Sequence, residues 1–171
     1  MSSATMTPQR AAQETLRAYH HGGAPRLPVD PVAVARSLGV NVYEVVLPNT
    51  TSGMIAKVSD VAGTDILVNS EHAPKRQRFT VAHELGHYIA ILNDPDRVSN
   101  PFLHKRDSLS SCGTDTEEIF ANRFAAELLM PEDEVRRAAR VGASVYQLAA
   151  QFDVSVDAMN FRLVNLGLAR G

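Results

Sequence analysis

The feature that most constrains the folding of this chain is the pentapeptide His83-Glu84-Leu85-Gly86-His87. Apolar residues recur at helical spacing around it, from Phe79 to Leu92, and predict one helix that ends near Asn93-Asp94-Pro95. Residues four apart in an α-helix lie about 40° apart around the axis and about 6 Å apart along it. Both imidazoles therefore project from one face of the helix, where both can reach a single cation.

The chemistry of this pentapeptide is typical of a zinc site. Neutral imidazole is a good ligand for zinc, and a zinc ion that keeps one open position needs a third protein ligand. Glu84 lies beside the first imidazole, where it can take a proton from an attacking water. The alternative is a solvated helix face with two ordinary histidines. Gly86 costs the helix about 1 kcal/mol relative to alanine, which the close approach of another backbone would explain.

The predicted third ligand is an acidic side chain on a helix that begins near Thr114, where Thr114-Asp115-Thr116-Glu117 fits a capping box. Glu118 is the preferred candidate, and it shares a helix face with Asn122, four residues further on. Glu117 is better suited to close the cap, and Glu127 lies further along the helix. Both remain competitors for the third position.

Composition limits the remaining possibilities. The chain has 171 residues with 44% hydrophobic content, which is enough for one ordinary domain with a core. Its formal net charge is −2, from 17 basic and 19 acidic residues, and gives no electrostatic reason to expect nucleic acid or an anionic membrane. There is no signal-like N-terminus, and the single cysteine, Cys112, cannot form an internal disulfide. We therefore expect a cytoplasmic protein.

The hydrophobic pattern predicts an α+β fold. Three runs rich in Val or Ile and bounded by turn residues, Val40 to Leu47, Gly53 to Val58 and Asp65 to Val68, predict a small three-stranded antiparallel sheet. Stretch 93–113 is polar and long for a connection, so it is functional or mobile. Further helices are predicted for residues 8–21, 31–38, 132–140, 145–152 and 156–166.

Two segments resemble the signatures of the ImmA/IrrE-type metallopeptidases. The first is Arg78-Phe79-Thr80-Val81-Ala82-His83-Glu84-Leu85-Gly86-His87, and the second is Glu118-Ile119-Phe120-Ala121-Asn122-Arg123-Phe124-Ala125-Ala126-Glu127-Leu128-Leu129-Met130-Pro131. The resemblance covers about residues 28–169. It implies a zincin-like helical core under the sheet, with Glu118 as the third zinc ligand beside His83 and His87, and Glu84 as the catalytic acid/base. One departure is Phe120, where many relatives carry a polar residue, and we interpret it as local packing.

This resemblance completes the functional prediction. We expect an N-terminal helix and linker (1–27), a metallopeptidase core (28–142) and a C-terminal helix-turn-helix-like segment (143–171). The implied function is an endopeptidase, using zinc or another divalent metal, that cleaves a helix-turn-helix repressor of stress or mobile-element genes. The alternatives are a regulatory module that keeps the metal without cleaving, and a toxin-like protein neutralised by a DNA-binding partner.

Several assignments stay open within this prediction. Tyr88, His104 and Arg106 are weak candidates for a second oxyanion donor, and the strand Gly53 to Val58 could pair with an extended substrate. The basic cluster Lys75-Arg76-Gln77-Arg78 is either a solvated face or a guide for an acidic segment of a substrate.

The C-terminal segment and Cys112 also allow more than one interpretation. The segment offers Asn160 and Arg162 as possible DNA contacts, but the acidic Asp153 and Asp157 would repel the phosphates. Core packing or a protein-binding surface is therefore favoured over direct DNA binding. The sequence does not predict an oligomeric state. Cys112 is either a partly buried, inert thiol or a residue that acts at the metal.

Overall fold

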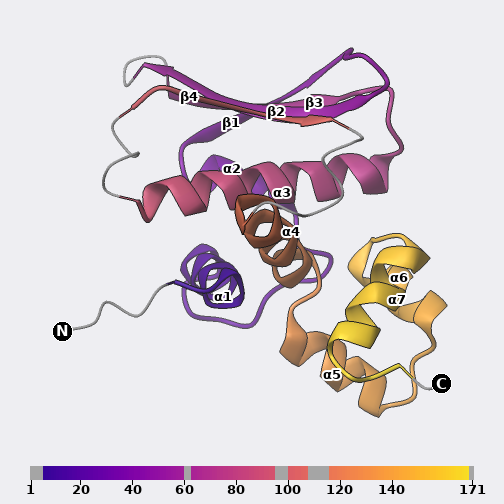
Figure 1. The fold of residues 1–171 in the computed structure, drawn as a ribbon. Helices are drawn as coiled ribbons and strands as arrows, with labels where there is room; N and C mark the ends of the chain where they lie inside the picture. Colours follow the sequence, from indigo (N-terminus) through magenta and orange to yellow (C-terminus); the bar gives the residue numbers. More distant parts are fainter. Residues whose placement is uncertain (1–5, 60–62, 95–99, 108–115, 170–171) are drawn as a thin grey trace.

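A computed structural model describes residues 6–59, 63–94, 100–107 and 116–169. Within these ranges the fold is α+β, and one mixed sheet lies over a set of helices (Figure 1). The helices are α1 (Pro8–Tyr19), α2 (Pro31–Ser37), α3 (Pro74–Leu92), α4 (Thr116–Leu129), α5 (Glu132–Arg140), α6 (Val145–Phe152) and α7 (Val156–Asn165). The strands are β1 (Val40–Val45), β2 (Thr51–Ser59), β3 (Gly63–Asn69) and β4 (Phe102–Asp107).

The sheet differs from the predicted three-stranded antiparallel arrangement in two ways. Its strand order is β1-β3-β2-β4, and β1 runs parallel to β3 while the other pairs are antiparallel. The fourth strand, β4, lies in the stretch predicted as a connection. Its sequence Phe102-Leu103-His104-Lys105-Arg106-Asp107 is mostly polar and charged, as edge strands often are, so apolar alternation could not identify it.

The position of β2 also corrects the prediction about substrate pairing. β2 is hydrogen-bonded to β3 along one side and to β4 along the other. Both of its edges are therefore occupied, and the strand predicted at Gly53 to Val58 cannot accept an added strand.

Helix α3 joins the sheet to the helical layer. It contacts β2 and β3 on one side and is crossed by α4 on the other, with α1 packed beside α4 (Figure 1). Apolar side chains from α3 and α4 fill the space between these elements. Fully buried examples are Leu85, Phe124 and Leu128.

The crossing of α3 and α4 depends on Gly86. A Cβ atom at this position would lie 2.8 Å from Cα of Ala121 and 3.1 Å from its carbonyl oxygen. The predicted close approach of another backbone is therefore confirmed, and that backbone is the one that carries Glu118. Gly53 has the same role at the sheet, because a Cβ there would lie 2.5 Å from Cγ2 of Thr80 in α3.

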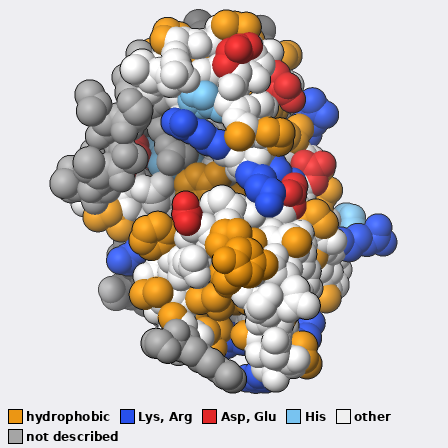
Figure 2. All heavy atoms as spheres, turned by 90° about the vertical axis from the view of Figure 1, so that its right-hand side faces the viewer, with side chains coloured by type: hydrophobic (Ala, Val, Ile, Leu, Met, Phe, Trp, Pro, Cys, Tyr) orange, Lys and Arg blue, Asp and Glu red, His pale blue; other side chains and the backbone are white. Residues whose placement is uncertain are grey.

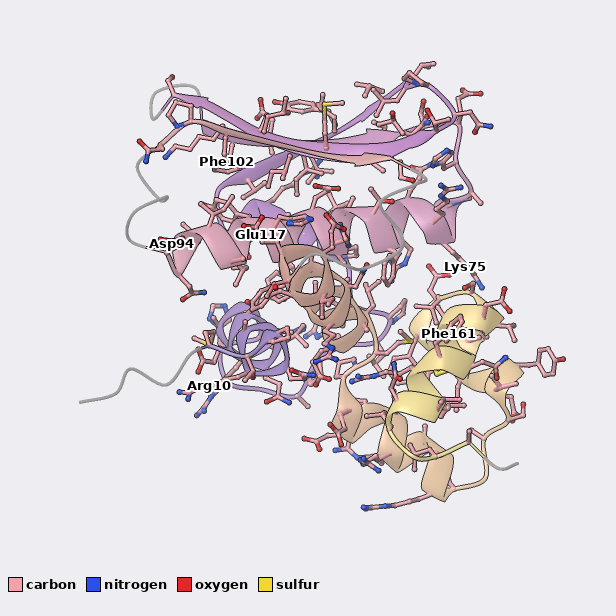
Figure 3. The ribbon with its side chains drawn as sticks, viewed as in Figure 1. Arg10, Lys75, Asp94, Phe102, Glu117 and Phe161 are labelled. Carbon is pink, nitrogen blue, oxygen red and sulfur yellow. The ribbon has the colours of Figure 1, made fainter. Side chains whose placement is uncertain are left out.

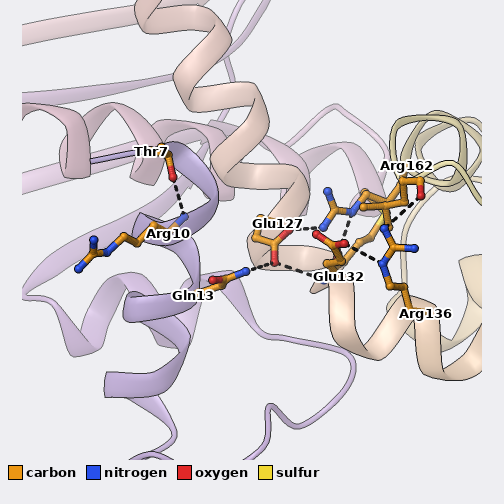
Figure 4. A network of polar contacts seen from close by, with 9 residues as sticks. Thr7, Arg10, Gln13, Glu127, Glu132, Arg136 and Arg162 are labelled. Atoms are coloured by element: carbon orange, nitrogen blue, oxygen red, sulfur yellow. Dashed lines mark hydrogen bonds and ion pairs between the residues drawn. The ribbon is translucent and has the colours of Figure 1, made fainter. Parts of the chain in front are cut away.

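A buried polar network holds the C-terminal helices against α4 (Figure 4). Arg162 of α7 forms an ion pair with Glu127 of α4, and its Nε donates to the carbonyl of Met130 at 3.0 Å. Oε1 of Glu127 also accepts hydrogen bonds from Nε2 of Gln13 at 3.2 Å and from the backbone N–H of Glu132 at 3.3 Å. Glu127 is thus engaged in this network, away from the predicted metal ligands.

None of the helices in the described part of the chain has the length and apolar character that a membrane span requires.

Candidate metal centre

Three potential ligands converge where the first turn of α4 meets the middle of α3. His83 and His87 are buried on α3, with 0% and 2% of their side chains exposed, and Glu118 on α4 is 19% exposed. Oε2 of Glu118 lies 3.3 Å from Nε2 of His83, and its Oε1 lies 3.0 Å from Nε2 of His87. The two Nε2 atoms are 3.1 Å apart. In Figure 3, the label of the neighbouring Glu117 lies where the start of α4 meets α3.

These spacings match the donor set of a four-coordinate zinc ion. Ligand atoms bound tetrahedrally at about 2.0–2.1 Å are separated by about 3.3 Å from one another. The measured separations of 3.0, 3.1 and 3.3 Å are close to that value. Two imidazole nitrogens and one carboxylate are also a ligand set that zinc accepts in catalytic sites. The residues present therefore fit a divalent metal ion with a coordination position left open.

Asn122 fixes the orientation of one imidazole. Its side-chain oxygen Oδ1 lies 2.9 Å from Nδ1 of His83. Because an amide oxygen can only accept a hydrogen bond, Nδ1 of His83 carries the proton and donates it. Nε2 of His83 then has its lone pair directed at Nε2 of His87 and the Glu118 carboxylate. This tautomer leaves Nε2 of His83 free to bind a cation shared with Nε2 of His87 and the Glu118 carboxylate.

Sequence reasoning placed Asn122 on the ligand face of its helix but gave it no role. Its spacing of four residues from Glu118 was the available signal, since both side chains then point across the same turn toward α3. The need for an amide at that position could be inferred only once Nδ1 of His83 was known to face it.

Glu84 occupies the position after His83 on α3, and 0% of the residue is exposed. Acidic side chains are almost never buried to this degree without a structural or functional partner. Its burial beside the three converging ligands agrees with a role at the site. The catalytic assignment of Glu84 itself remains a prediction at this point.

Other candidates fall outside the centre or outside the described residues. Tyr88 is half-buried and packs against the core. The side chains of His104 and Arg106, like Cys112 and the predicted cap at Thr114, are not among those that the structure describes.

Glu117 and His72 also lie outside the three converging ligands and have structural contacts. Glu117 is half-buried in the first turn of α4. The imidazole of His72 lies 3.1 Å from the carbonyl of Asn49 and 3.4 Å from the side chain of Asn69, so it supports the loop between β1 and β2.

A His-Glu-x-x-His helix crossed by a second helix that supplies a glutamate is the arrangement of a metallopeptidase domain. Comparison with known families agrees, because the profile of the IrrE N-terminal-like domain, a peptidase family, matches residues 35–164. The chain therefore belongs to the IrrE N-terminal-like family.

Two relatives that the chain resembles in sequence are named as a metalloprotease and a metallopeptidase. The chain is 37% identical over 105 residues to the radiation response metalloprotease IrrE of Deinococcus deserti, which covers 57% of this chain and 35% of that protein. It is 30% identical over 116 residues to the metallopeptidase ImmA of Bacillus subtilis, covering 63% of this chain and 61% of ImmA. The chain thus aligns with about a third of the first protein and three fifths of the second.

A solved structure shows the same fold. A transcriptional regulator from Mycobacterium tuberculosis superposes with a TM-score of 0.58 over 90% of this chain and 46% of its own length, at 19% sequence identity. At this identity the likeness concerns the arrangement of helices and strands alone.

Proposed function

We propose that this chain is a zinc-dependent endopeptidase. The observation that carries the proposal is the convergence of His83, His87 and Glu118, whose ligand atoms all lie within 4.8 Å of one another. Membership of a peptidase family and relatives named as metalloproteases support it. The alternatives without catalysis require the same ligands but assign no task to Glu84.

The protein residues have separate roles in this mechanism. His83, His87 and Glu118 hold the metal, and Asn122 keeps the imidazole of His83 in the tautomer that leaves Nε2 free to bind. A zinc ion bound there supplies Lewis-acid chemistry, because it lowers the pKa of water and polarises a carbonyl oxygen. Glu84 accepts the proton of the attacking water and later delivers it to the nitrogen of the leaving amine.

The proposed substrate is a helix-turn-helix transcriptional repressor. The resemblance of the two signature segments to the ImmA/IrrE-type peptidases supports this choice. The chain is 37% identical to IrrE over 105 residues and 30% identical to ImmA over 116 residues. Zinc is the favoured metal because two imidazoles and one carboxylate suit it, whereas magnesium and calcium prefer oxygen ligands throughout.

The deciding experiment compares the wild-type chain with the Glu84→Gln variant. Each zinc-loaded protein is incubated with candidate helix-turn-helix repressors from the same organism, and products are identified by mass spectrometry. We expect one defined cut by the wild type and none by Glu84→Gln, although zinc content stays at one ion per chain. Equal cleavage by both proteins would refute the role of Glu84. Repressor binding without cleavage by either would favour a non-catalytic regulatory module.

A further inference from the structure

A groove lies between the first turn of α3, the end of α4 and helix α7. Its volume is about 470 Å³, within the range of about 300–1,000 Å³ in which proteins bind ligands. In Figure 3, Lys75 extends from the start of α3 toward the C-terminal helices, and Phe161 lies on α7. Both labelled residues line the groove.

The walls of the groove are largely apolar. They include Phe79 of α3, Ala126 and Met130 near the end of α4, and Ala158 and Phe161 of α7. Phe161 is 72% exposed, which is unusual for a phenylalanine that has a core beside it. Figure 2 looks onto this side of the molecule and shows hydrophobic side chains gathered in the middle of the face, with Lys and Arg side chains above them. Contiguous apolar surface of this kind marks interaction sites.

Two cations at the rim of the groove have no acidic partner among the described residues. Nζ of Lys75 donates to the carbonyl of Val154 at 3.0 Å, and Nη2 of Arg76 donates to Oγ of Ser52 at 2.8 Å. Both acceptors are neutral, so within the described part of the chain neither positive charge is balanced by a carboxylate. The positive end of the α3 dipole lies at the same rim.

The other charged residues that line the groove do not neutralise Lys75 and Arg76. Arg162 is neutralised by Glu127, and among the described residues that line the groove Asp157 on α7 is the one carboxylate. The lining therefore has a surplus of positive charge next to apolar side chains.

The shape of the groove favours a helical occupant. Its walls come from three helices and one short connection, so no strand edge is available for a peptide to extend the sheet. An amphipathic helix buries its apolar face in a groove of this type. Acidic residues beside that apolar face would complement Lys75 and Arg76.

We propose that the groove binds an amphipathic helical segment of a partner protein that carries acidic residues next to its apolar face. The groove adjoins the metal centre: Phe79 precedes His83 by one helical turn, about 6 Å along α3, and Ala126 follows Asn122 by one turn of α4. A segment bound there holds the adjacent part of its own chain close to the three ligands. Calling that segment part of the substrate rests on the proposed peptidase function, whereas the binding itself does not.

The test is peptide selection on the zinc-loaded Glu84→Gln chain, which binds without cutting. The probe is a phage-displayed library of helical peptides with a fixed leucine stripe and randomised neighbours. Enriched peptides are then measured by fluorescence anisotropy. We expect Asp and Glu to be enriched beside the stripe. Binding should weaken about tenfold in Lys75→Glu/Arg76→Glu, because two attractive contacts become repulsive.

Two further variants separate the groove from general charge effects. Phe161→Ser removes an exposed apolar wall without disturbing the core and should also weaken binding about tenfold. Arg17→Glu/Arg140→Glu has the same change in net charge at exposed positions outside the groove and should bind like the parent.

Three outcomes would overturn the proposal. These are a failure to enrich any peptide, enrichment without acidic residues, and equal binding by the parent and the Lys75→Glu/Arg76→Glu variant. A dimer in sedimentation equilibrium that Phe161→Ser dissociates would also overturn it, because it would assign the groove to a second copy of this chain. None of these results affects cleavage by the wild type, so failure here is distinguishable from failure of the peptidase proposal.

Discussion

Replacing Gly86 with alanine tests how the fold builds the metal centre. In the interior of an exposed helix, this change stabilises a protein by about 1 kcal/mol. Here the new Cβ would lie 2.8 Å from Cα of Ala121, about 0.6 Å closer than ordinary contact, which begins near 3.4 Å. The opposing atom belongs to the backbone and cannot rotate away, so α4 must shift.

The balance of these two effects is unfavourable. Overpacking of this kind costs about 1–3 kcal/mol, which exceeds the gain in helix propensity. We expect Gly86→Ala to lower the free energy of unfolding by about 1 kcal/mol and the Tm by about 2–4 °C. Because α4 carries Glu118, a shift of about 0.6 Å also exceeds the tolerance of about 0.2 Å in metal–ligand distances.

Two measurements on one variant check this reasoning. Urea denaturation of the metal-free protein gives the change in stability, and competition with a chromogenic chelator gives zinc affinity. We expect zinc affinity to fall at least tenfold, by about 1.4 kcal/mol. A larger residue, as in Gly86→Val, should have a stronger effect on both. An alanine variant that is more stable than the parent and binds zinc equally well would show that α3 and α4 do not approach as described.

Three further results are expected. Asn122→Leu should lower zinc affinity about 10–100-fold in chelator competition. Asn122→Asp still accepts the hydrogen bond from His83 and should retain that affinity. Equal loss in both variants would contradict an orienting role. Glu127→Gln should reduce the free energy of unfolding by about 3 kcal/mol in urea denaturation, because it leaves the buried charge of Arg162 uncompensated; a loss below about 1 kcal/mol would show that water reaches this pair. The pKa of His20 is lowered from 6.5, chiefly by burial and then by the charges of Arg26 and His21. The unfolded state therefore binds more protons as the pH falls below about 6.5, and stability decreases there. His20→Gln should flatten this decrease in pH-dependent thermal melts, and an unchanged slope would contradict the assignment.

The candidate ligands were predictable from the sequence because their placement is local. The spacing of four between His83 and His87 fixes their common face once the helix forms. Glu118 followed from the capping signal and from the resemblance of its helix to a family signature. The five helices predicted with both ends were found within two residues of those ends for the same reason, since caps, prolines and glycines act over a single turn.

The sheet was less predictable because strand pairing is not a local property. Runs rich in Val or Ile identified β1, β2 and β3, but the order of the strands depends on pairing between residues far apart in the sequence. β4 carries charged residues that suit an exposed edge, and the same residues made it look like a connection. The groove likewise depends on the contact of Arg162 with Glu127, which are 35 residues apart, and no local signal pairs them.

Helix α4 links the metal centre to the groove through its periodicity. Glu118, Asn122 and Ala126 follow one another at intervals of four, so they form a continuous face along the helix, and Met130 comes directly after its last residue. The first two contact the histidines of α3, and the last two line the groove. Glu127 lies about 100° further around the helix than Ala126 and pairs with α7. The same helix therefore places the third ligand and supports the opposite wall of the groove. A shift of α4, as expected for Gly86→Ala, should for this reason weaken zinc binding and peptide binding together, whereas Asn122→Leu should weaken zinc binding alone.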